Sequence, residues 1–343
     1  MNAPTPRPSP LGPPRYVLGV DLGGTKISVG AMRSSGGHAI ALRSEPTRAE
    51  EGADAVVARI VAMLNGVMAE AGTTLGATRD QFAGVGIGSP GPLDRARGLV
   101  ITTPNLGWHD FPLRDRVASA VRLPATLDND ANCATLGEWW VGAAVGGRNV
   151  VGMTIGTGIG GGLILDGRLY HGSSDAAGEI GHTSIDSTGR RCKCGNYGCL
   201  EAYASGPAIA ERAREALAGG ETSSMLALAG GNPAALTAQH VYEASKMGDP
   251  VAREVVRETA RFIGTGLANL INIFNPDVVV LAGGVAQAGD DLFTPLRAEV
   301  HRRAFKPAVD ACRIVPGALA GAAGVVGAVA TFLEQHPDVV AAA

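Results

Sequence analysis

The sequence predicts an α/β protein built from two packed lobes. Its 343 residues exceed one small domain, and a hydrophobic content of 45% supports ordinary cores. Glycine occurs 49 times, whereas aromatic residues make up only 4% of the chain. This composition suits tight turns and close packing of helices on sheets. One glycine-rich block also occurs twice, and we expect one copy at the head of each lobe.

The two copies of this block are "RYVLGVDLGGTKISVGAM" and "NVVGMTIGTGIGGGLILDG". Each predicts a β-hairpin whose turn exposes backbone N–H groups and a threonine, Thr25 or Thr157. Glycine lets a backbone approach phosphate oxygens closely, so such turns can bind anions. Neither copy is a Walker loop or a Rossmann fingerprint, because both of those motifs open into a helix. The first turn offers Asp21, Gly23, Gly24, Thr25 and Lys26.

The first turn has two interpretations. Asp21 could hold Mg²⁺ through water while the turn holds a phosphate. Alternatively, the segment is an ordinary hairpin turn with ordinary glycine chemistry. The second copy shifts the balance toward phosphate, because two facing hairpins can clasp a polyphosphate.

The remaining pattern alternates strands and helices. "FAGVGIGSPGPLD" predicts a buried strand and a turn, and "TRAEEGADAVVARIVAMLNGVMAEAG" has helical periodicity. Helices are expected over about 207–218 and about 250–273, followed by a strand over 277–282 and a turn at Gly283 and Gly284. We predict a disordered tail over 1–15, an N-terminal lobe over 16–128 and a C-terminal lobe over 129–320. The last helix, 321–343, is expected to pack back on the N-terminal lobe.

The segment "LDNDAN" combines Asp128, Asn129 and Asp130 where a strand passes into a helix. A lone aspartate at such a place usually caps the helix. Beside a phosphate site, a carboxylate can instead take the proton of an attacking hydroxyl group. Asp128 is predicted to end the strand, whereas Asp130 opens the helix and can point into a cleft.

Three of the five cysteines lie in one polar loop, "HTSIDSTGRRCKCGNYGCLE". His182, Cys192, Cys194 and Cys199 form a complete Cys₃His set, which predicts a structural zinc ion with no open coordination position. The alternative is a group of free cysteines, which would be prone to oxidation. Cys133 and Cys312 are isolated and expected to be packed. Glu179 and Glu201 flank the loop; each alone is usually solvated, but together they could present carboxylates to a polyol.

The charge and the termini of the chain limit the function classes. The net charge of −3 indicates neither a nucleic-acid surface nor an anionic-membrane partner. The start, "MNAPTPRPSPLGPP", has no apolar run and is not a signal peptide, and no apolar run approaches transmembrane length. We therefore expect a cytoplasmic protein with reduced thiols.

Taken together, these motifs resemble the ROK family (repressor, open reading frame, kinase), and within it the bacterial glucokinases. The resemblance extends from Tyr16 to nearly the end of the chain. It rests on "GVDLGGTK", "GIGSPGPLD", "LDNDANCATLGE", "TIGTGIGGG", "AGEIGHTSID", "CKCGNYGCLE" and "VVVLAGGV" in the family's order. It implies a two-lobe actin/hexokinase-like fold of the ribonuclease-H-like type, with ATP and sugar in the interlobe cleft.

The resemblance also implies a role for each matching residue. Asp130 matches the general base that deprotonates the 6-hydroxyl of a hexose. The implied sugar contacts are Asn105, Asn129, Asp130, Glu179, His182 and Glu201. The implied zinc ligands are His182, Cys192, Cys194 and Cys199. The implied nucleotide contacts are Asp21, Gly23, Gly24, Thr25, Lys26, Gly156, Thr157, Gly158, Gly283 and Gly284, with ATP and Mg²⁺ as cofactors.

The expected activity is ATP-dependent formation of glucose 6-phosphate. The same motifs leave open an N-acetylmannosamine kinase or a fructokinase, and a polyphosphate donor is not indicated. A non-catalytic sugar sensor is the alternative from another class, and the intact Asp130 and both phosphate turns argue against it. The family's repressors carry a helix-turn-helix before the first phosphate motif, where this chain has a proline-rich tail, so no DNA binding is expected. Family likeness suggests a homodimer or homotetramer.

Overall fold

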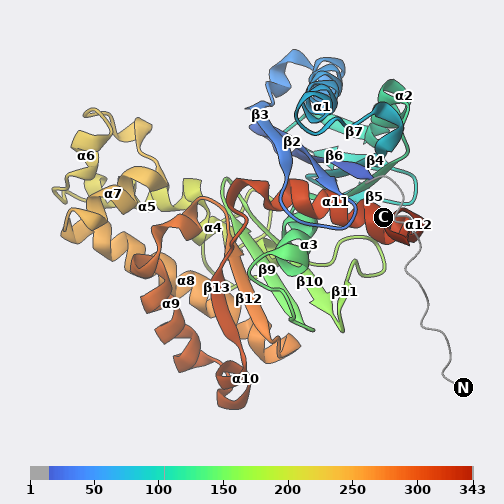
Figure 1. Ribbon diagram of the computed structural model, residues 1–343. Helices are drawn as coiled ribbons and strands as arrows, with labels where there is room; N and C mark the ends of the chain where they lie inside the picture. The colour runs from blue at the N-terminus through green and yellow to red at the C-terminus, as the bar shows by residue number, and fades with distance from the viewer. Residues whose placement is uncertain (1–14, 104, 342–343) are drawn as a thin grey trace, which may run out of the picture. The chain divides into compact units, whose positions relative to one another are not determined.

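The computed structural model describes residues 15–103 and 105–341, so all but Arg15 of the predicted tail lies outside the described residues. The chain divides into two compact units, which are described separately. Unit 1 comprises the chain up to Cys133 together with the segment from Ala322 onward, and unit 2 comprises Ala134–Gly321. The last helices therefore belong to unit 1 even though they follow unit 2 in the sequence (Figure 1).

Unit 1 is organised around a five-stranded sheet with the order β3-β2-β1-β4-β8. β1 pairs antiparallel with β2 and parallel with β4, and β4 pairs parallel with β8. A second, three-stranded sheet has the order β5-β6-β7. The strands are β1 (Tyr16–Leu22), β2 (Lys26–Arg33), β3 (Ile40–Pro46), β4 (Phe82–Ser89), β5 (Leu93–Asp94), β6 (Leu99–Thr103), β7 (Trp108–Phe111) and β8 (Ala125–Asn129). The helices are α1 (Ala53–Leu75), α2 (Leu113–Val121), α11 (Ala323–Gln335) and α12 (Pro337–Ala341), with short 3₁₀ turns η1 (Ala49–Glu51) and η2 (Arg79–Gln81).

Glycines on β1 and β4 let α11 approach the sheet of unit 1 closely. A Cβ atom at Gly19 would lie 2.3 Å from the carbonyl oxygen of Val325, and one at Gly86 would lie 1.6 Å from that of Ala328. Side chains alternate between the two faces of a strand. Asp21 therefore lies on the same face as Gly19, at the start of α11, whereas Leu18 and Val20 join the core formed with α1.

Helix α1 is long and apolar enough to cross a membrane, judged by length and composition alone. This differs from the expectation that no apolar segment approaches that length. The core helix of a globular unit passes the same test, and α1 has eight buried residues along its length. They belong to the core of unit 1 with residues of β1, β2 and α2, because hydrophobic positions recur on one face of the helix.

Unit 2 repeats the strand arrangement of unit 1. Its sheet has the order β11-β10-β9-β12-β13, with an antiparallel hairpin followed by parallel strands. The strands are β9 (Val150–Ile155), β10 (Ile159–Leu165), β11 (Arg168–Leu169), β12 (Val278–Ala282) and β13 (Arg313–Pro316). In both units the first two strands along the chain, β1–β2 and β9–β10, form the hairpin that the repeated glycine-rich block predicts.

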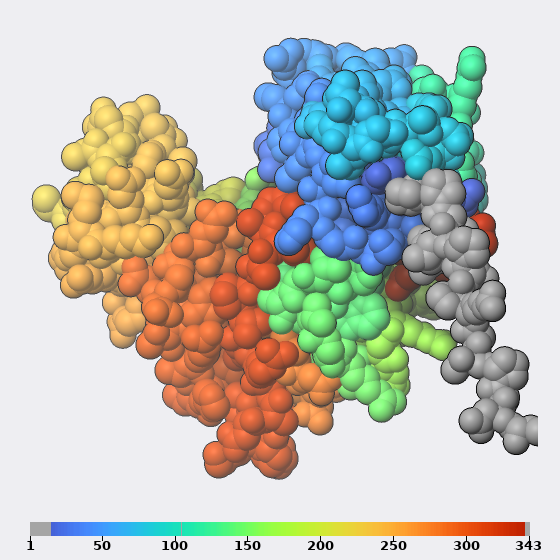
Figure 2. Space-filling model, in the orientation of Figure 1, coloured from blue at the N-terminus to red at the C-terminus, as the bar shows by residue number. Residues whose placement is uncertain are grey.

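Helices surround the sheet of unit 2, and the longest of them is α8 (Pro250–Phe274). The N-terminus of α8 is capped by Asp249, whose side-chain Oδ1 accepts a hydrogen bond from the N–H of Ala252 at 2.9 Å. Pro250 occupies the first turn of the helix. Residues of α6 and α7 form a protrusion of this unit, coloured gold in Figure 2. The remaining helices are α4 (Glu201–Ala204), α5 (Gly206–Ala218), α6 (Met225–Leu228), α7 (Ala238–Lys246), α9 (Asp290–Arg303) and α10 (Lys306–Ala311). The 3₁₀ turns are η3 (Ile180–His182), η4 (Pro233–Ala235), η5 (Val285–Ala288) and η6 (Ala320–Ala322). Helix α3 (Asp130–Val141) begins in unit 1 and continues into unit 2.

We predict that Gly86→Ala destabilises unit 1 by about 3 kcal/mol or more, because the new methyl group meets the backbone of α11 and neither element can retreat cheaply. Urea unfolding measures the effect. Gly72→Ala on α1 is the matched control, since its Cβ atom would lie 3.3 Å from the nearest atom and alanine favours a helix. Equal stability of the two variants would contradict the packing of α11 on β4.

Candidate active site

The first hairpin turn leaves backbone N–H groups unpaired. The Gly23 N–H donates to the Lys26 carbonyl at 2.9 Å and closes the turn on one side. The N–H groups of Gly24 and Thr25 donate to no other residue in the part of the chain that the structure describes. Asn105 lies beside this turn, because a Cβ atom on Gly24 would be 3.2 Å from that of Asn105. The turn therefore has the free donors that an anion requires.

The carboxyl group of Asp21 lies where burial and a nearby carboxylate disfavour its charged form. Asp21 is the second-last residue of β1 and lies at the first turn of α11, where a Cβ atom on Gly324 would lie 2.4 Å from its carboxyl carbon. Burial, and secondly the charge of Asp130, raise the pKa of Asp21 to about 7, against a smaller lowering by Lys26. Two carboxylates that repel one another beside a turn with free N–H donors are suited to a cation, which relieves the repulsion.

The segment Asp128–Asp130 joins β8 to α3, and Asp130 opens the helix as predicted, but the strand ends at Asn129 and not at Asp128. The Asn129 Oδ1 accepts the N–H groups of Ala131 at 2.9 Å and Asn132 at 3.2 Å, so Asn129 performs the capping role. Its amide group donates to no residue in the described ranges. Asp130 accepts the N–H of Ala131 at 2.8 Å and is half-buried. Its carboxylate is therefore held at a helix N-terminus while still accessible to a substrate.

An ion pair with a buried carboxylate holds the strand before Asp130, and no sequence motif indicated this pair. Asp128 is fully buried, and its Oδ2 lies 2.9 Å from the Nε of Arg95. Its Oδ1 accepts the N–H of Asn129 at 2.8 Å and the side-chain amide of Asn132 at 3.2 Å. Removing one partner of such a pair leaves a charge buried without compensation. Arg95 and Asp128 therefore fix the backbone from which Asp130 projects.

In unit 2, the second hairpin turn lies against Glu201. The Oε2 of Glu201 accepts the N–H of Ile159 at 2.8 Å, just after the turn formed by Gly156, Thr157 and Gly158. The Gly156 carbonyl accepts the N–H of Gly206 at 2.8 Å. The N–H groups of Thr157 and Gly158 have no acceptor among the residues that the structure describes. The second turn thus shares the free donors of the first.

Gly283 and Gly284 follow β12 next to this second turn. Gly283 has a φ of 90°, and a Cβ atom there would lie 2.4 Å from the carbonyl oxygen of Ile155. Only glycine fits such a position, on both counts. A Cβ atom on Gly284 would meet nothing within 4 Å, so this backbone is open for a ligand.

His182, Cys192, Cys194 and Cys199 converge in unit 2. One ligand atom from each lies within 4.8 Å of all the others. The Sγ atoms of Cys194 and Cys199 are 3.7 Å apart, and the Nδ1 of His182 is 3.8 Å from the Sγ of Cys192. Zinc–sulfur bonds of about 2.3 Å in a tetrahedron give sulfur–sulfur edges of about 3.8 Å. The four residues therefore fit a zinc ion.

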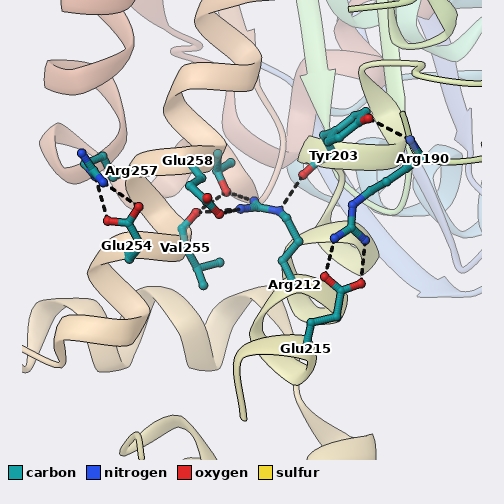
Figure 3. A network of polar contacts seen from close by, with 9 residues as sticks. Arg190, Tyr203, Arg212, Glu215, Glu254, Val255, Arg257 and Glu258 are labelled. Carbon is teal, nitrogen blue, oxygen red and sulfur yellow. Dashed lines mark hydrogen bonds and ion pairs between the residues drawn. The ribbon is translucent and has the colours of Figure 1, made fainter. Parts of the chain in front are cut away.

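The polar loop that carries these ligands is attached to the helices of unit 2 by a second set of contacts (Figure 3). The hydroxyl of Tyr203 accepts the N–H of Arg190 at 2.8 Å, and the guanidinium of Arg190 forms two bonds to Glu215 on α5. The buried Arg212 donates to the carbonyl of Tyr203 at 3.2 Å and to Glu258 on α8 at 3.1 Å. Protein contacts thus hold the middle of the loop and α4 independently of any metal.

The predicted site residues are divided between the two units. In unit 1, Asn105 lies at the first turn, and Asp21 interacts with Asp130. In unit 2, Glu201 lies at the second turn, while Glu179 is exposed directly before the 3₁₀ turn that ends at His182. Cys133 is buried as expected, and Cys312 is partly exposed at the edge of the core of unit 2.

We predict that Asp21→Asn stabilises the protein at pH 8 in Mg²⁺-free buffer. A pKa of about 7 in the folded state, above the ordinary 3.8, means that folding costs stability above pH 7 and that this cost disappears as the pH falls toward 4. The gain is at most about 4 kcal/mol at pH 8 and about half that at pH 5.5. Thermal unfolding over this pH range measures it, with the exposed Asp115→Asn as control. A gain that does not depend on pH would contradict the raised pKa.

We predict that the purified protein contains about one zinc ion per chain and that Cys194→Ser loses it. Loss of the metal is expected to lower the Tm by about 5 °C or more, because the two remaining thiols, Cys192 and Cys199, and His182 then lie together without a cation. Metal analysis and calorimetry measure both effects. Cys312→Ser is the matched control, since Cys312 lies outside the cluster and should leave zinc and Tm unchanged. Absence of zinc from the purified wild-type protein would refute the assignment of this loop as a zinc site.

Comparison with known proteins covers almost the whole chain. A sequence model described as the ROK family matches residues 17–335. The glucokinase of Halalkalibacterium halodurans is 36% identical over 314 residues, which is 91% of this chain and 93% of that protein. The xylose repressor of Caldicellulosiruptor bescii is 34% identical over 252 residues, 74% of this chain and 63% of that protein.

The fold is also shared with a solved structure, the crystal structure of a ROK family glucokinase from Streptomyces griseus in complex with glucose and AMPPNP. The two chains superpose with a TM-score of 0.79 at 35% identity, over 92% of this chain and 98% of the other. The predicted actin/hexokinase-like fold and the predicted family are confirmed. This chain is a member of the ROK family.

Proposed function

We propose that the protein transfers the γ-phosphoryl group of ATP to the 6-hydroxyl of glucose. The observation that carries the proposal is the half-buried Asp130 at the start of α3, in the same unit as a hairpin turn with free N–H donors. The full-length relationship to glucokinases, one of them in complex with glucose and AMPPNP, supports the choice of glucose and ATP.

Asp130 is the proposed general base. A sugar hydroxyl is too weakly acidic to attack phosphorus unaided, so a carboxylate within hydrogen-bond reach accepts its proton as the new bond forms. The buried pair of Arg95 and Asp128 acts through the backbone, because it limits how far β8 and the start of α3 can move. Positioning of this kind accounts for a large part of phosphoryl transfer rates.

The proposed sugar contacts are Asn105, the free amide of Asn129, Asp130, Glu179, His182 and Glu201. Sugar hydroxyls both donate and accept hydrogen bonds, so carboxylates and amides suit them. The Oε2 of Glu201 already holds Ile159, which leaves its other oxygen for a hydroxyl. Glu201 would then connect the sugar to the second phosphate turn.

The proposed nucleotide contacts are the turns with free N–H groups. Those of Gly24, Thr25, Thr157 and Gly158 donate to phosphate oxygens, and Gly283 and Gly284 leave room for the rest of the nucleotide. Asp21 and Lys26 complete this set. Mg²⁺ would be held near Asp21 and would neutralise charge on the β- and γ-phosphates.

We assign zinc a structural role, in which it holds the loop that carries His182 and leads into Glu201. With four protein ligands there is no open position for a substrate, so the metal shapes the pocket without taking part in the chemistry. We also propose a cytoplasmic location, because the three clustered thiols suit a reducing compartment. A homodimer or homotetramer remains our proposal for the assembly.

The proposal is tested by ADP formation with Mg·ATP against glucose, mannose, fructose, N-acetylglucosamine and N-acetylmannosamine. Glucose is expected to be preferred. Asp130→Asn should lower kcat by about 10²- to 10⁴-fold while glucose still binds, because only the proton acceptor is lost. Asp115→Asn, an exposed carboxylate of the same unit, is the control and should match the wild type.

Each other outcome has a specific meaning. Activity on an acetylated amino sugar alone, or on fructose alone, would show that glucose is not the substrate. The assignments of Asp130 as the base and of zinc as a structural metal would still stand. Near wild-type turnover by Asp130→Asn would refute the role of that residue. Sugar binding without ADP formation by zinc-loaded protein would favour a sensor, the class to which a relative named as a xylose repressor points.

A further inference from the structure

Thr47 is an unusual residue for a surface connection. It directly follows β3, whose last five residues are exposed, yet its own side chain is fully buried. A buried hydroxyl group requires a hydrogen-bond partner. The partner of Thr47 is the first hairpin turn, which the sequence motifs did not connect with this residue.

Thr47 bonds both carbonyl groups that flank the centre of this turn. Its Oγ1 donates to the carbonyl of Gly23 at 2.7 Å, and its N–H donates to the carbonyl of Thr25 at 2.9 Å. In a two-residue hairpin of regular form, the Gly23 carbonyl would accept the N–H of Lys26. That bond is missing between these two described residues, and the hydroxyl of Thr47 takes its place.

These two bonds determine where the neighbouring N–H groups point. Across a planar trans peptide, a carbonyl and the following N–H point in opposite directions. Because the Gly23 carbonyl faces Thr47, the N–H of Gly24 points away from it, and the same holds for the N–H of Lys26 after Thr25. Thr47 thus directs the free N–H of Gly24 to the side opposite to itself.

Thr47 is itself held in place by a hydrogen bond from helix α1. The carbonyl of Thr47 accepts from Arg59 of α1 at 2.6 Å, and the same guanidinium is paired with Glu51. The side chain of Arg59 is only 14% exposed. The turn is therefore connected to the long helix α1 through a chain of hydrogen bonds rather than resting on a mobile loop.

The second hairpin turn shows the same arrangement with a different donor. There the carbonyl of Gly156 accepts the backbone N–H of Gly206 at 2.8 Å. Each turn therefore has the carbonyl before its free N–H groups held by a segment outside the hairpin. Only in the first turn is the donor a side chain, so only there can a substitution remove it.

We propose that Thr47 is a positioning residue for phosphate binding, which holds the first turn in the orientation that presents its N–H groups to the nucleotide. The inference rests on the proposed assignment of Gly23–Lys26 to the phosphates. The hydroxyl carries the role, because the methyl group of threonine contributes only packing.

The test compares Thr47→Val, which removes the hydroxyl at nearly constant shape, with Thr47→Ser, which keeps it. Thr331→Val is the matched control, since the Oγ1 of Thr331 is also buried and donates to a backbone carbonyl, that of Ala328, at 2.8 Å in the same unit. The measurements are the dissociation constant of AMPPNP by calorimetry, the KM values for Mg·ATP and glucose, and the Tm. Thr47→Ala replaces Thr47→Val if the latter does not fold.

We expect Thr47→Val to weaken AMPPNP binding and raise the KM for Mg·ATP by about 5- to 20-fold, while the KM for glucose changes less than twofold. Thr47→Ser and Thr331→Val should bind AMPPNP within twofold of the wild type. AMPPNP binding by Thr47→Val that equals that of Thr331→Val would overturn the proposal, as would equal losses in Thr47→Ser and Thr47→Val. A wild-type protein that binds no AMPPNP would refute the nucleotide function itself, and with it this role.

Discussion

The close approach of α11 to the sheet of unit 1 is the contact on which the arrangement of that unit depends. α11 follows the whole of unit 2 in the sequence, yet its backbone lies against Gly19 and Gly86, where any side chain would collide with it. This approach brings the first turn of α11 to Asp21 and buries the carboxyl group there. The same sheet contains β8, which ends at Asn129 directly before Asp130.

Both hairpin turns have free N–H groups on one side, whereas hydrogen bonds from outside the hairpin hold them on the other. A glycine-rich turn has many accessible conformations, and ordering it on binding costs conformational entropy. Bonds from outside each hairpin reduce that cost before a ligand arrives, through Thr47 in unit 1 and through Gly206 and Glu201 in unit 2. The free N–H groups are thus prearranged, which is how binding sites gain affinity without additional contacts.

The loop between His182 and Cys199 shows how a polar segment is held without a core of its own. It has few apolar side chains, so burial alone cannot stabilise it. Two sets of contacts hold it: four metal-ligating side chains converge, and Arg190, in the middle of the loop, bonds Tyr203 of α4 and Glu215 of α5. Two independent attachments are appropriate for a loop that runs directly into Glu201, because a small displacement there reaches the second turn.

The sequence by itself determined the local features: the two hairpins, the strand-to-helix junction at Asp130, the set of zinc-ligating residue types and the family. These depend on residues close together in the chain, where glycine, apolar periodicity and ligand spacing act directly. Only the tertiary structure decided that Thr47 holds the first turn, that Arg95 pairs with Asp128, and that α11 lies on β1 and β4. Each joins segments tens to hundreds of residues apart, and a threonine or arginine with a distant partner looks in the sequence like any other polar residue. The physical reason is that a hydrogen bond depends on where the fold places two groups, and no local pattern encodes that distance.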